Sequence, residues 1–515
     1  DSRRIECGVG EVTNEQSNLP RLPQGWVWTK FEEICKVLRA GGTPSTKIKE
    51  YYENGTIPFV KIKDIVNSKR YLYDTTTKIT EEGLNNSSAW LVPKDSLLYS
   101  MYASYGEPII NGIEVATSQA IIAYIPPDNL MVLDYIYFYL KKIRPELKTR
   151  GTTQRNLNAQ IVRNIPIPLP PLPEQCRIVR KIDELFSILD AGVESLKKIK
   201  TLSRPYRQAV VKYAVEGRLT EQWRKTHSDK IEPASALIER ILRNRRATWE
   251  TMELIKMGKK GQIPKDDSWK KKYKDPKAPD TSSLPDLPEG WIWISWNQIS
   301  NWVTYGFTRP MSHVCDGIPI ITAKNVINRK IDFENTDKTT REAFESLSEK
   351  DRPKTGDILI TKDGTIGNAA VVPDQVSLCI NQSVAVIWLR SCPLNRNYLI
   401  AVIESPITQR LIRAKARGVA IQHLSITDFA KMPLPLPPLE EQNIIAEEIE
   451  RRISICDEVE KAVEQSLLQA ESLRQSILKK AFEGNLDPQD LSEEPAEKLL
   501  DRIKVELAKG FGEGK

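Results

Sequence analysis

The chain has 515 residues, which at about 150 residues per domain corresponds to three or four domains. Its 40% hydrophobic and 28% charged residues are typical of a globular protein with several cores, and they exclude a chain that is disordered throughout. No apolar run approaches the roughly 18 residues of a membrane span, and the polar N-terminus shows no secretory signal. We therefore expect a cytoplasmic protein.

Charge is unevenly distributed along the chain. Lys and Arg number 75 against 68 Asp and Glu, a formal net charge of +7. Residues 220–285 hold 16 Lys and Arg and 10 Asp and Glu, a net charge of +6. Our main interpretation of this basic linker is a solvated charged segment, and the alternative is contact with a DNA backbone or a partner protein. Within it, residues 236–257 have the apolar periodicity of a helix.

An internal repeat dominates the sequence. The segment Leu22–Trp28, Leu-Pro-Gln-Gly-Trp-Val-Trp, returns at Leu287–Trp293 as Leu-Pro-Glu-Gly-Trp-Ile-Trp. The proline-rich segment Pro166–Leu172 returns at Pro433–Leu439, and both copies continue with Glu-Gln after one residue. Such a repeat predicts two copies of one structural unit.

Each copy changes its periodicity once. The first part of each copy has short β-branched and aromatic runs, which predict strands, including one over residues 57–65 and its counterpart at residues 318–326. After the prolines, residues 174–216 and the stretch from 440 to 484 have apolar residues at helical spacing, and Gly217 and Gly484 suit the C′ position. A helix of 43 residues would be about 64 Å long and needs a partner helix. Pro205 and Gly192 predict a bend in the first helix.

The predicted fold class is α+β, with two strand-rich domains in tandem repeat, separated by two long antiparallel, coiled-coil-like helices. The expected boundaries follow from the repeat and the periodicity. They are an N-terminal tail (1–20), a first strand-rich domain (21–170), a first spacer helix (171–218), a basic linker with a short helix (219–284), a second strand-rich domain (285–437), a second spacer helix (438–485) and a C-terminal tail with a helix (486–515).

Two domains that open with Leu-Pro-x-Gly-Trp-x-Trp and continue into Pro-Leu-Pro-Pro-Leu-x-Glu-Gln and a long helix resemble the specificity (S) subunit of type I restriction-modification enzymes. The resemblance covers residues 22 to about 507. It implies two target recognition domains that each read one half of an asymmetric bipartite site in double-stranded DNA. It also implies two modification (M) subunits that methylate adenine with S-adenosylmethionine, and two restriction (R) subunits that cleave DNA with ATP and Mg²⁺.

Candidate DNA contacts are polar residues at matched places in the two copies. Lysines and amides suit phosphate and adenine, and arginine suits guanine or phosphate. The alternatives are a solvated strand face for the lysines, core packing for the tyrosine, and turn capping for the amides. The candidates are Lys47, Lys61, Lys63, Tyr102, Ser104, Gln154, Arg155, Arg309, Lys324, Asn325, Lys362, Thr365 and Gln422.

We find no pattern that predicts catalysis. Three histidines lie far apart without Cys or carboxylates at metal-ligand spacing, and the seven scattered cysteines never form Cys-x-x-Cys. Neither an ATP-binding Gly-x-x-x-x-Gly-Lys-Ser/Thr loop nor an Asn/Asp-Pro-Pro-Tyr/Phe motif of amino-methylases is present. We therefore expect a non-catalytic chain that binds no metal or cofactor itself. The alternative is a scaffold whose duplicated modules bind protein or glycan and whose helices oligomerise.

Overall fold

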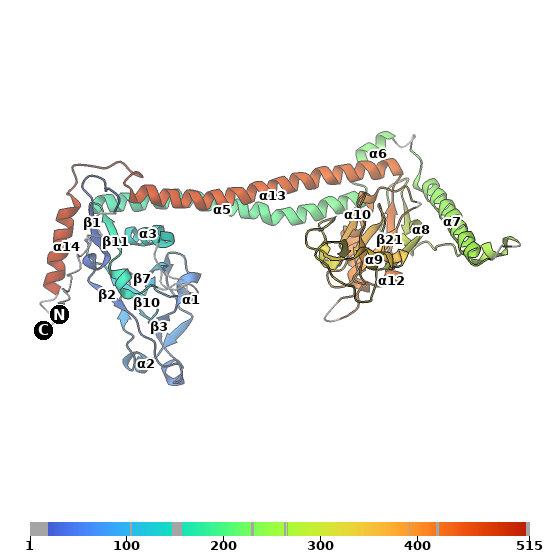
Figure 1. Cartoon of the computed structure of the whole chain (residues 1–515). Helices are drawn as coiled ribbons and strands as arrows, with labels where there is room; N and C mark the ends of the chain where they lie inside the picture. Colours follow the sequence, from blue (N-terminus) through green and yellow to red (C-terminus); the bar gives the residue numbers. More distant parts are fainter. Residues whose placement is uncertain are drawn as a thin grey trace, which may run out of the picture. The chain divides into compact units, whose positions relative to one another are not determined.

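A computed structural model of the chain describes residues 19–102, 106–146, 157–227, 231–261, 264, 266–390, 392–418 and 422–510 (Figure 1). The chain divides into two compact units. Unit 1 comprises Asp1–Leu196 and Gln465–Lys515, and unit 2 comprises Lys197–Glu464. The predicted fold class is confirmed: each unit holds one strand-rich domain, and the two long helices α5 (Leu172–Val215) and α13 (Leu439–Phe482) each contribute to both units.

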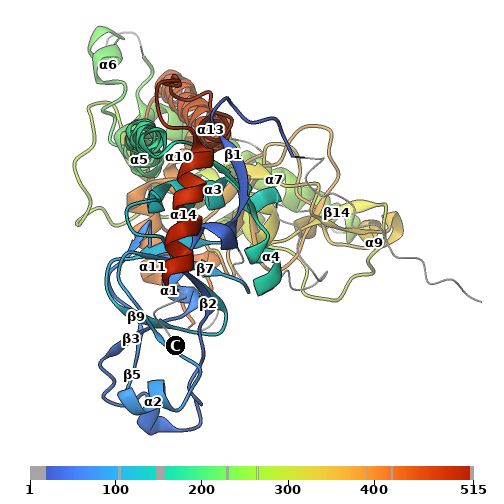
Figure 2. The same ribbon diagram turned by 90° about the vertical axis from the view of Figure 1, so that its left-hand side faces the viewer.

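Two sheets and a two-stranded ribbon build the domain of unit 1. A five-stranded sheet has the order β2 (Val37–Ala40), β10 (Ile121–Ile125), β7 (Ser96–Ser100), β8 (Pro108–Asn111), β4 (Tyr71–Leu72). A four-stranded sheet has the order β5 (Thr77–Ile79), β3 (Ile57–Val60), β9 (Val115–Thr117), β6 (Leu91–Val92), and β1 (Val27–Lys30) pairs with β11 (Pro166–Leu169). The helices are α1 (Ile62–Asn67), α2 (Glu81–Asn85), α3 (Leu133–Ile143), α4 (Ala159–Arg163) and α14 (Ala496–Gly510). Figure 2 shows α2, β3 and β5 at the end of this domain farthest from α5.

Unit 2 repeats this plan, with one strand fewer in each of its two sheets. One sheet has the order β13 (Trp302–Tyr305), β21 (Val384–Trp388), β18 (Ile358–Thr361), β19 (Ala369–Val371). A second has the order β17 (Asp337–Thr339), β14 (Ile318–Ile321), β20 (Cys379–Ile380). The strand pairs are β15 (Val326–Ile327) with β16 (Lys330–Ile331), and β12 (Ile292–Ser295) with β22 (Pro433–Leu436). The helices are α6 (Glu221–His227), α7 (Ala234–Lys259), α8 (Trp296–Ile299), α9 (Arg341–Glu345), α10 (Arg396–Glu404), α11 (Pro406–Lys415) and α12 (Ile426–Ala430).

The long helices pack antiparallel within each unit. In unit 1, Arg474 near the end of α13 pairs with Asp190 of α5. In unit 2, Lys200 Nζ lies 2.9 Å from Glu464 Oε1, and Arg207 Nη2 lies 2.6 Å from Asp457 Oδ1. The partner residue in α13 thus moves back as the position in α5 advances. Pro205 lies inside α5 and does not end it.

Each long helix ends in the core of one unit. Phe482 of α13 packs edge-on against Tyr135 and Tyr139 in unit 1, and Val215 of α5 lies in the hydrophobic core of unit 2. Gly217 and Gly484 have φ of +71° and +70°, which confirms their prediction as left-handed C′ residues.

The repeated sequence motifs tie each strand-rich domain to its helix. Trp26 Nε1 donates to Glu174 Oε2 at 2.9 Å, and Trp291 Nε1 donates to Glu441 Oε2 at 2.8 Å. The next residue also links domain and helix: Gln442 Oε1 accepts from the N–H of Asn395, the N-cap of α10, at 3.1 Å. Its counterpart Gln175 does the same for Val132, the N-cap residue of α3. The repeated Trp and Glu-Gln residues therefore have a structural role in both copies.

A glycine at a matched place in each domain allows two backbone segments to cross closely. A Cβ on Gly306 would lie 1.8 Å from the carbonyl oxygen of Ile380, and a Cβ on Gly41 would lie 2.1 Å from that of Thr117. Because both contacts are with backbone atoms, no side-chain movement can relieve them. The chain that follows β13 or β2 must therefore have glycine at this crossing.

We expect Gly306→Ala to destabilise unit 2 by about 3 kcal/mol or more, since forced overpacking costs roughly 1–3 kcal/mol even where neighbours can shift. Urea unfolding followed by circular dichroism measures the change. Gly258→Ala is the matched control, because a Cβ there meets no atom within 4 Å inside α7. The control should be neutral or gain up to about 1 kcal/mol from helix propensity. Equal stability of the two variants would contradict the close crossing.

Candidate nucleic-acid interface

In unit 2, two loops that are distant in sequence are joined by backbone hydrogen bonds. The loop after β18, residues 362–367, meets the segment around Gln422. Leu424 N donates to Lys362 O at 2.7 Å, and Gly364 N donates to Gln422 O at 3.1 Å. His423 also exchanges two backbone bonds with Arg417. The structure therefore brings together three of the predicted contacts, Lys362, Thr365 and Gln422.

The side chains around this junction are polar, and they differ in whether their polar groups are already paired within the protein. Lys362 Nζ pairs with Asp363 at 2.7 Å and lies 5.3 Å from the centre of the Tyr305 ring. Asp363 Oδ1 also contacts His423 Nδ1 at 2.8 Å. The side chains of Thr365 and Gln422 are exposed. The ammonium group of Lys362 is thus already neutralised locally, whereas Thr365 and Gln422 can make hydrogen bonds to a ligand.

Unit 1 has the same junction. Leu157 N donates to Met101 O at 2.8 Å, and Gly106 N donates to Ser100 O at 2.9 Å, as Gly367 N does to Thr361 O. Tyr102 lies here with 42% of its surface exposed, and the neighbouring Tyr99 is buried, which raises its pKa. Ser104, Gln154 and Arg155 lie outside the described residues.

The prediction that Lys61, Lys63, Lys324 and Asn325 lie on a strand face is wrong. Strands β3 and β14 end at Val60 and Ile321, and a helical turn follows in each domain. The cause is a capping interaction that the strand pattern hides: Asp64 Oδ2 accepts from Lys61 N at 2.8 Å, and Asn325 Oδ1 accepts from Thr322 N at 3.0 Å. A capping residue three positions into a segment starts a helix instead of extending a strand.

Asn325 is buried, and both the oxygen and the nitrogen of its amide are hydrogen-bonded within the domain. Its Oδ1 accepts from Thr322, and its Nδ2 donates to Asn335 O at 2.9 Å. We therefore assign Asn325 a capping role and leave it out of the interface. Lys63 and Lys324 immediately precede the two caps and have exposed side chains. They remain at matched positions, on helical turns instead of strands.

The remaining candidates lie on other loops. Lys61 is half-buried, with its ammonium group 5.9 Å from the centre of the Tyr52 ring. Lys47 is exposed on the loop after β2. Arg309 is exposed on the loop after β13, where its Nη2 donates to Ser346 Oγ at 2.9 Å.

Arg417 is a cation at the unit 2 junction that the sequence reasoning missed. It is exposed and pairs through its backbone with His423. The signal was present in the repeat, because Lys415-Ala-Arg417-Gly418 matches Lys148-Thr-Arg150-Gly151. Arg150 lies outside the described residues.

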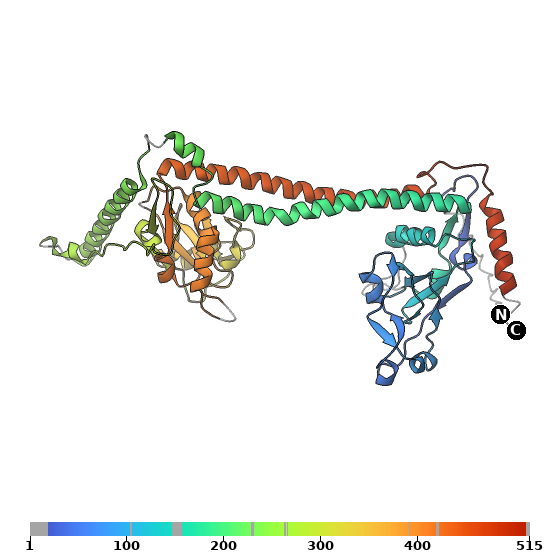
Figure 3. The same ribbon diagram turned by 180° about the vertical axis from the view of Figure 1, so that it is seen from behind.

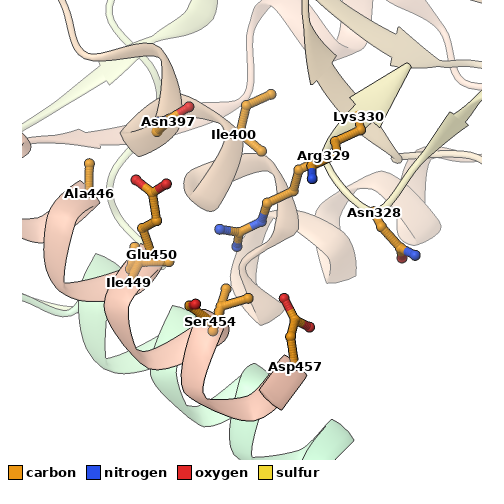
Figure 4. Close-up of a pocket in the computed structure, with 11 residues that line it drawn as sticks. Asn328, Arg329, Lys330, Asn397, Ile400, Ala446, Ile449, Glu450, Ser454 and Asp457 are labelled. Atoms are coloured by element: carbon orange, nitrogen blue, oxygen red, sulfur yellow. The ribbon is translucent and has the colours of Figure 1, made fainter. Parts of the chain in front are cut away.

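A cavity of about 380 Å³ lies elsewhere in unit 2, between the β15–β16 turn, α10 and α13 (Figure 4). Arg329 projects into it and its Nε donates to Glu404 Oε2 at 2.6 Å. In unit 1 the corresponding region between domain and helix holds Arg70, which bonds both Asp134 and Asp183. The cavity contains none of the candidate DNA contacts, so we attribute it to the packing of domain on helix.

Among the described residues, no helix is long and apolar enough to span a membrane, and no three His, Cys, Asp or Glu side chains are grouped to hold a metal ion. The six cysteines in the described part of the chain are all free thiols.

The family model described as type I restriction modification DNA specificity domain matches residues 23–201 and 316–469, more than half of the chain. The chain belongs to this specificity family. It is 23% identical to the type I restriction enzyme EcoBI specificity subunit of Escherichia coli over 511 residues, covering 96% of this chain and 95% of that protein. It is 31% identical over 194 residues to the MjaIX specificity subunit of Methanocaldococcus jannaschii, covering 36% and 43%.

Solved structures have the same fold as this specificity-family chain. The HsdS subunit from Thermoanaerobacter tengcongensis aligns with a TM-score of 0.52 at 18% identity, covering 91% of this chain and 100% of that one. A chain from a structural study of type I R-M complex assembly aligns with a TM-score of 0.57, at the same identity and coverage. The two strand-rich domains are thus the target recognition domains of this family, and the junctions described above lie at equivalent places in each.

Proposed function

We propose that this chain is the DNA sequence-specificity subunit of a type I restriction-modification complex. Each target recognition domain reads one half of an asymmetric bipartite site in double-stranded DNA. The chain directs adenine methylation by two M subunits, which use S-adenosylmethionine, and cleavage by two R subunits, which use ATP and Mg²⁺. In this proposal the chain itself is not catalytic, because it supplies recognition and its partners supply the chemistry.

The proposal rests on one observation: the two domains share a hydrogen-bonded framework but differ in the residues of their loops. The Trp–Glu bond, the Gln bond and the loop-junction bonds recur in both domains with nearly equal lengths. The side chains at the junctions differ, since buried Met101 and exposed Tyr102 stand where Lys362 and Asp363 stand in the second domain. A shared frame with different contact residues is what two readers of unlike half-sites require, because base contacts determine specificity.

The long helices support a fixed gap between the half-sites. A helix of 44 residues is about 66 Å long. Two such helices packed antiparallel resist bending better than one, so their length would determine the spacing of two half-sites, as dimer geometry does in other DNA-binding proteins.

The proposal is tested by reconstituting the chain with its M subunits and measuring adenine methylation across a random-sequence duplex library. We expect one split motif with a constant gap. Replacing residues 23–170 by a second copy of residues 288–437 should convert the motif to two inverted copies of one half-site. Methylation that is uniform or absent with the natural chain would contradict the proposal and favour a scaffold with protein- or glycan-binding modules.

We expect Lys63→Gln and Lys324→Gln each to weaken DNA binding and to reduce the slope of log affinity against log salt by about one unit, as for the loss of one phosphate contact. Titrations of the complex with duplex DNA that contains the motif it methylates, at several salt concentrations, measure this slope. Lys78→Gln is the control in the first domain, since Lys78 is exposed on β5 and is not a candidate contact. An unchanged slope for either variant would remove that lysine from the interface.

A further inference from the structure

A concentration of positive charge lies outside the target recognition loops. Residues 243–277, which we call the basic arm, hold 12 Lys and Arg and five Asp and Glu, a net charge of +7. This equals the net charge of the whole chain, so the other 480 residues carry equal numbers of positive and negative groups. The basic arm comprises the second part of α7 and the 3-10 turn Asp267–Lys272.

Aromatic contacts fold the basic arm back on itself. Trp249 of α7 lies 6.0 Å from Trp269, ring centre to ring centre, and 5.2 Å from Tyr273. Arg245 Nη1 donates to the Tyr273 hydroxyl at 2.8 Å. These contacts hold the Lys270–Lys272 run beside α7, which carries Arg243, Lys256 and Lys259. The first turns of α7, with Leu237 and Ile241, are anchored in the unit 2 core. Figure 3 shows the rest of α7 projecting from the domain of unit 2.

Few carboxylates neutralise this charge. Arg246 pairs with Glu250, Lys256 with Glu253 and Lys270 with Asp267. Within the described part of the basic arm, seven further cations have exposed side chains and no ion pair: Arg243, Lys259, Lys260, Lys271, Lys272, Lys274 and Lys277. Like charges held together in this way repel each other, and a polyanion relieves that repulsion.

The corresponding helix of unit 1 has no such charge. Helix α14 begins as α7 does: Ala496 N donates to Gly25 O at 2.9 Å, and Ala234 N donates to Gly290 O at 3.1 Å. Residues 496–510 hold four Lys and Arg against three Asp and Glu. The shared frame therefore does not require a basic helix here, and the charge belongs to the extension of α7.

We propose that the basic arm binds the phosphate backbone of duplex DNA beyond the half-site that the second target recognition domain reads. This inference rests on the proposed function, which makes DNA the polyanion available to unit 2. A duplex carries one negative charge per roughly 1.7 Å of axis, and the 17 residues from Arg243 to Lys259 extend about 25 Å along α7. Contacts of this kind position the duplex and carry no sequence information.

A protein partner is the competing occupant, because Met252, Leu254 and Ile255 are also exposed on α7. The charge favours DNA: a protein surface would have to supply about seven carboxylates in register, whereas the phosphates of any duplex already form such a row. The two occupants predict different results in the following experiment.

The test compares two triple variants in the complex with M subunits. Lys260→Gln, Lys271→Gln and Lys272→Gln remove three charges from the basic arm. Lys498→Gln, Lys504→Gln and Lys509→Gln remove three exposed charges from α14 as the control. We expect the arm variant to reduce the slope of log affinity against log salt by two to three units, at about 0.9 per phosphate. Its methylated motif should be unchanged, and the control should keep the natural slope.

Three results are decisive. An unchanged slope in the arm variant overturns the proposal. An unchanged slope together with loss of M-subunit assembly, measured by size-exclusion chromatography, also overturns it and assigns the arm to a protein partner. If the natural complex methylates no defined motif, the proposed function fails, yet a reduced slope on random-sequence DNA would still support phosphate binding by the arm. Failure of the arm and failure of the proposed function are thus distinguishable.

Discussion

Replacing Glu441 by alanine should destabilise unit 2 by about 3–5 kcal/mol, the usual cost of removing one partner of a buried ion pair. The Glu441 side chain is 0% exposed and accepts three hydrogen bonds: from Trp291 Nε1 at 2.8 Å, from Thr220 Oγ1 at 2.6 Å and from Arg224 Nη1 at 2.6 Å. Its loss would leave the Arg224 guanidinium, 15% exposed, without a counter-charge. Urea unfolding of the full chain, followed by tryptophan fluorescence and circular dichroism, measures the change.

The neighbouring residue provides the matched control. Glu440 occupies the same first turn of α13 with an exposed side chain, so Glu440→Ala should change the free energy of unfolding by less than about 0.5 kcal/mol. The double variant Glu441→Ala with Arg224→Ala should lose less than the sum of the two single variants, since it leaves no uncompensated charge. A small effect of Glu441→Ala alone would show that the buried network does not hold α13 to its domain.

The equivalent carboxyl of unit 1 should respond differently to a neutral substitute. Glu174 accepts from Trp26 without a guanidinium bonded to it, and burial raises the pKa of Glu174. A raised pKa means that this site disfavours the charged form more than water does, so Glu174→Gln should cost about 1 kcal/mol or less. Glu441→Gln should cost more, because it leaves Arg224 charged and only hydrogen-bonded. Equal effects would contradict this difference between the two copies.

Lengthening both spacer helices should change which DNA sites are methylated. Inserting one heptad between Leu196 and Lys197 of α5, and another between Glu464 and Gln465 of α13, keeps the apolar positions of both helices in phase. Seven residues add about 10.5 Å, or at most about three base pairs at 3.4 Å each. We expect methylation of the original motif to fall at least tenfold, and a motif with the same half-sites and a longer gap to replace it.

The insertion points are chosen from the ion pairs of the helices. Lys200 and Glu464 face each other at 2.9 Å, so the two insertions fall at nearly the same level. An insertion in α5 alone is the control, because it displaces one helix against the other and should abolish methylation of every motif. Sequencing of the methylated library distinguishes the outcomes. An unchanged gap after the double insertion would show that the helices do not determine the spacing.

Much of the fold could be predicted from the sequence because the same pattern of motifs occurs twice along the chain. The two Trp-x-Trp segments, the two proline-rich segments and the long helical periodicities each occur at matched positions, and a pattern that recurs in order is independent of the weak propensity of any single residue. Gly217 and Gly484 could be placed at C′ for the same reason, since a left-handed residue after a long apolar stripe is a local requirement.

The candidate interface was less accessible to sequence reasoning. Residues 57–65 alternate as a strand would, yet the chain turns into α1 because Asp64 caps the helix start, and the same cap in unit 2 uses the amide of Asn325. The nearness of Lys362 to Gln422 depends on backbone bonds between segments about 60 residues apart, for which no local pattern exists.

The sequence by itself thus determined the duplication, the class of fold, the long helices and the excess of positive charge after the first helix, because these depend on composition, periodicity and repetition. Only the tertiary structure decided that the repeated Glu-Gln residues fasten each domain to its helix, that Asn325 is a buried cap, and that aromatic stacking gathers the cations of the basic arm. Each of these depends on which side chains meet after folding, and burial and hydrogen bonding between distant segments are not encoded in local spacing.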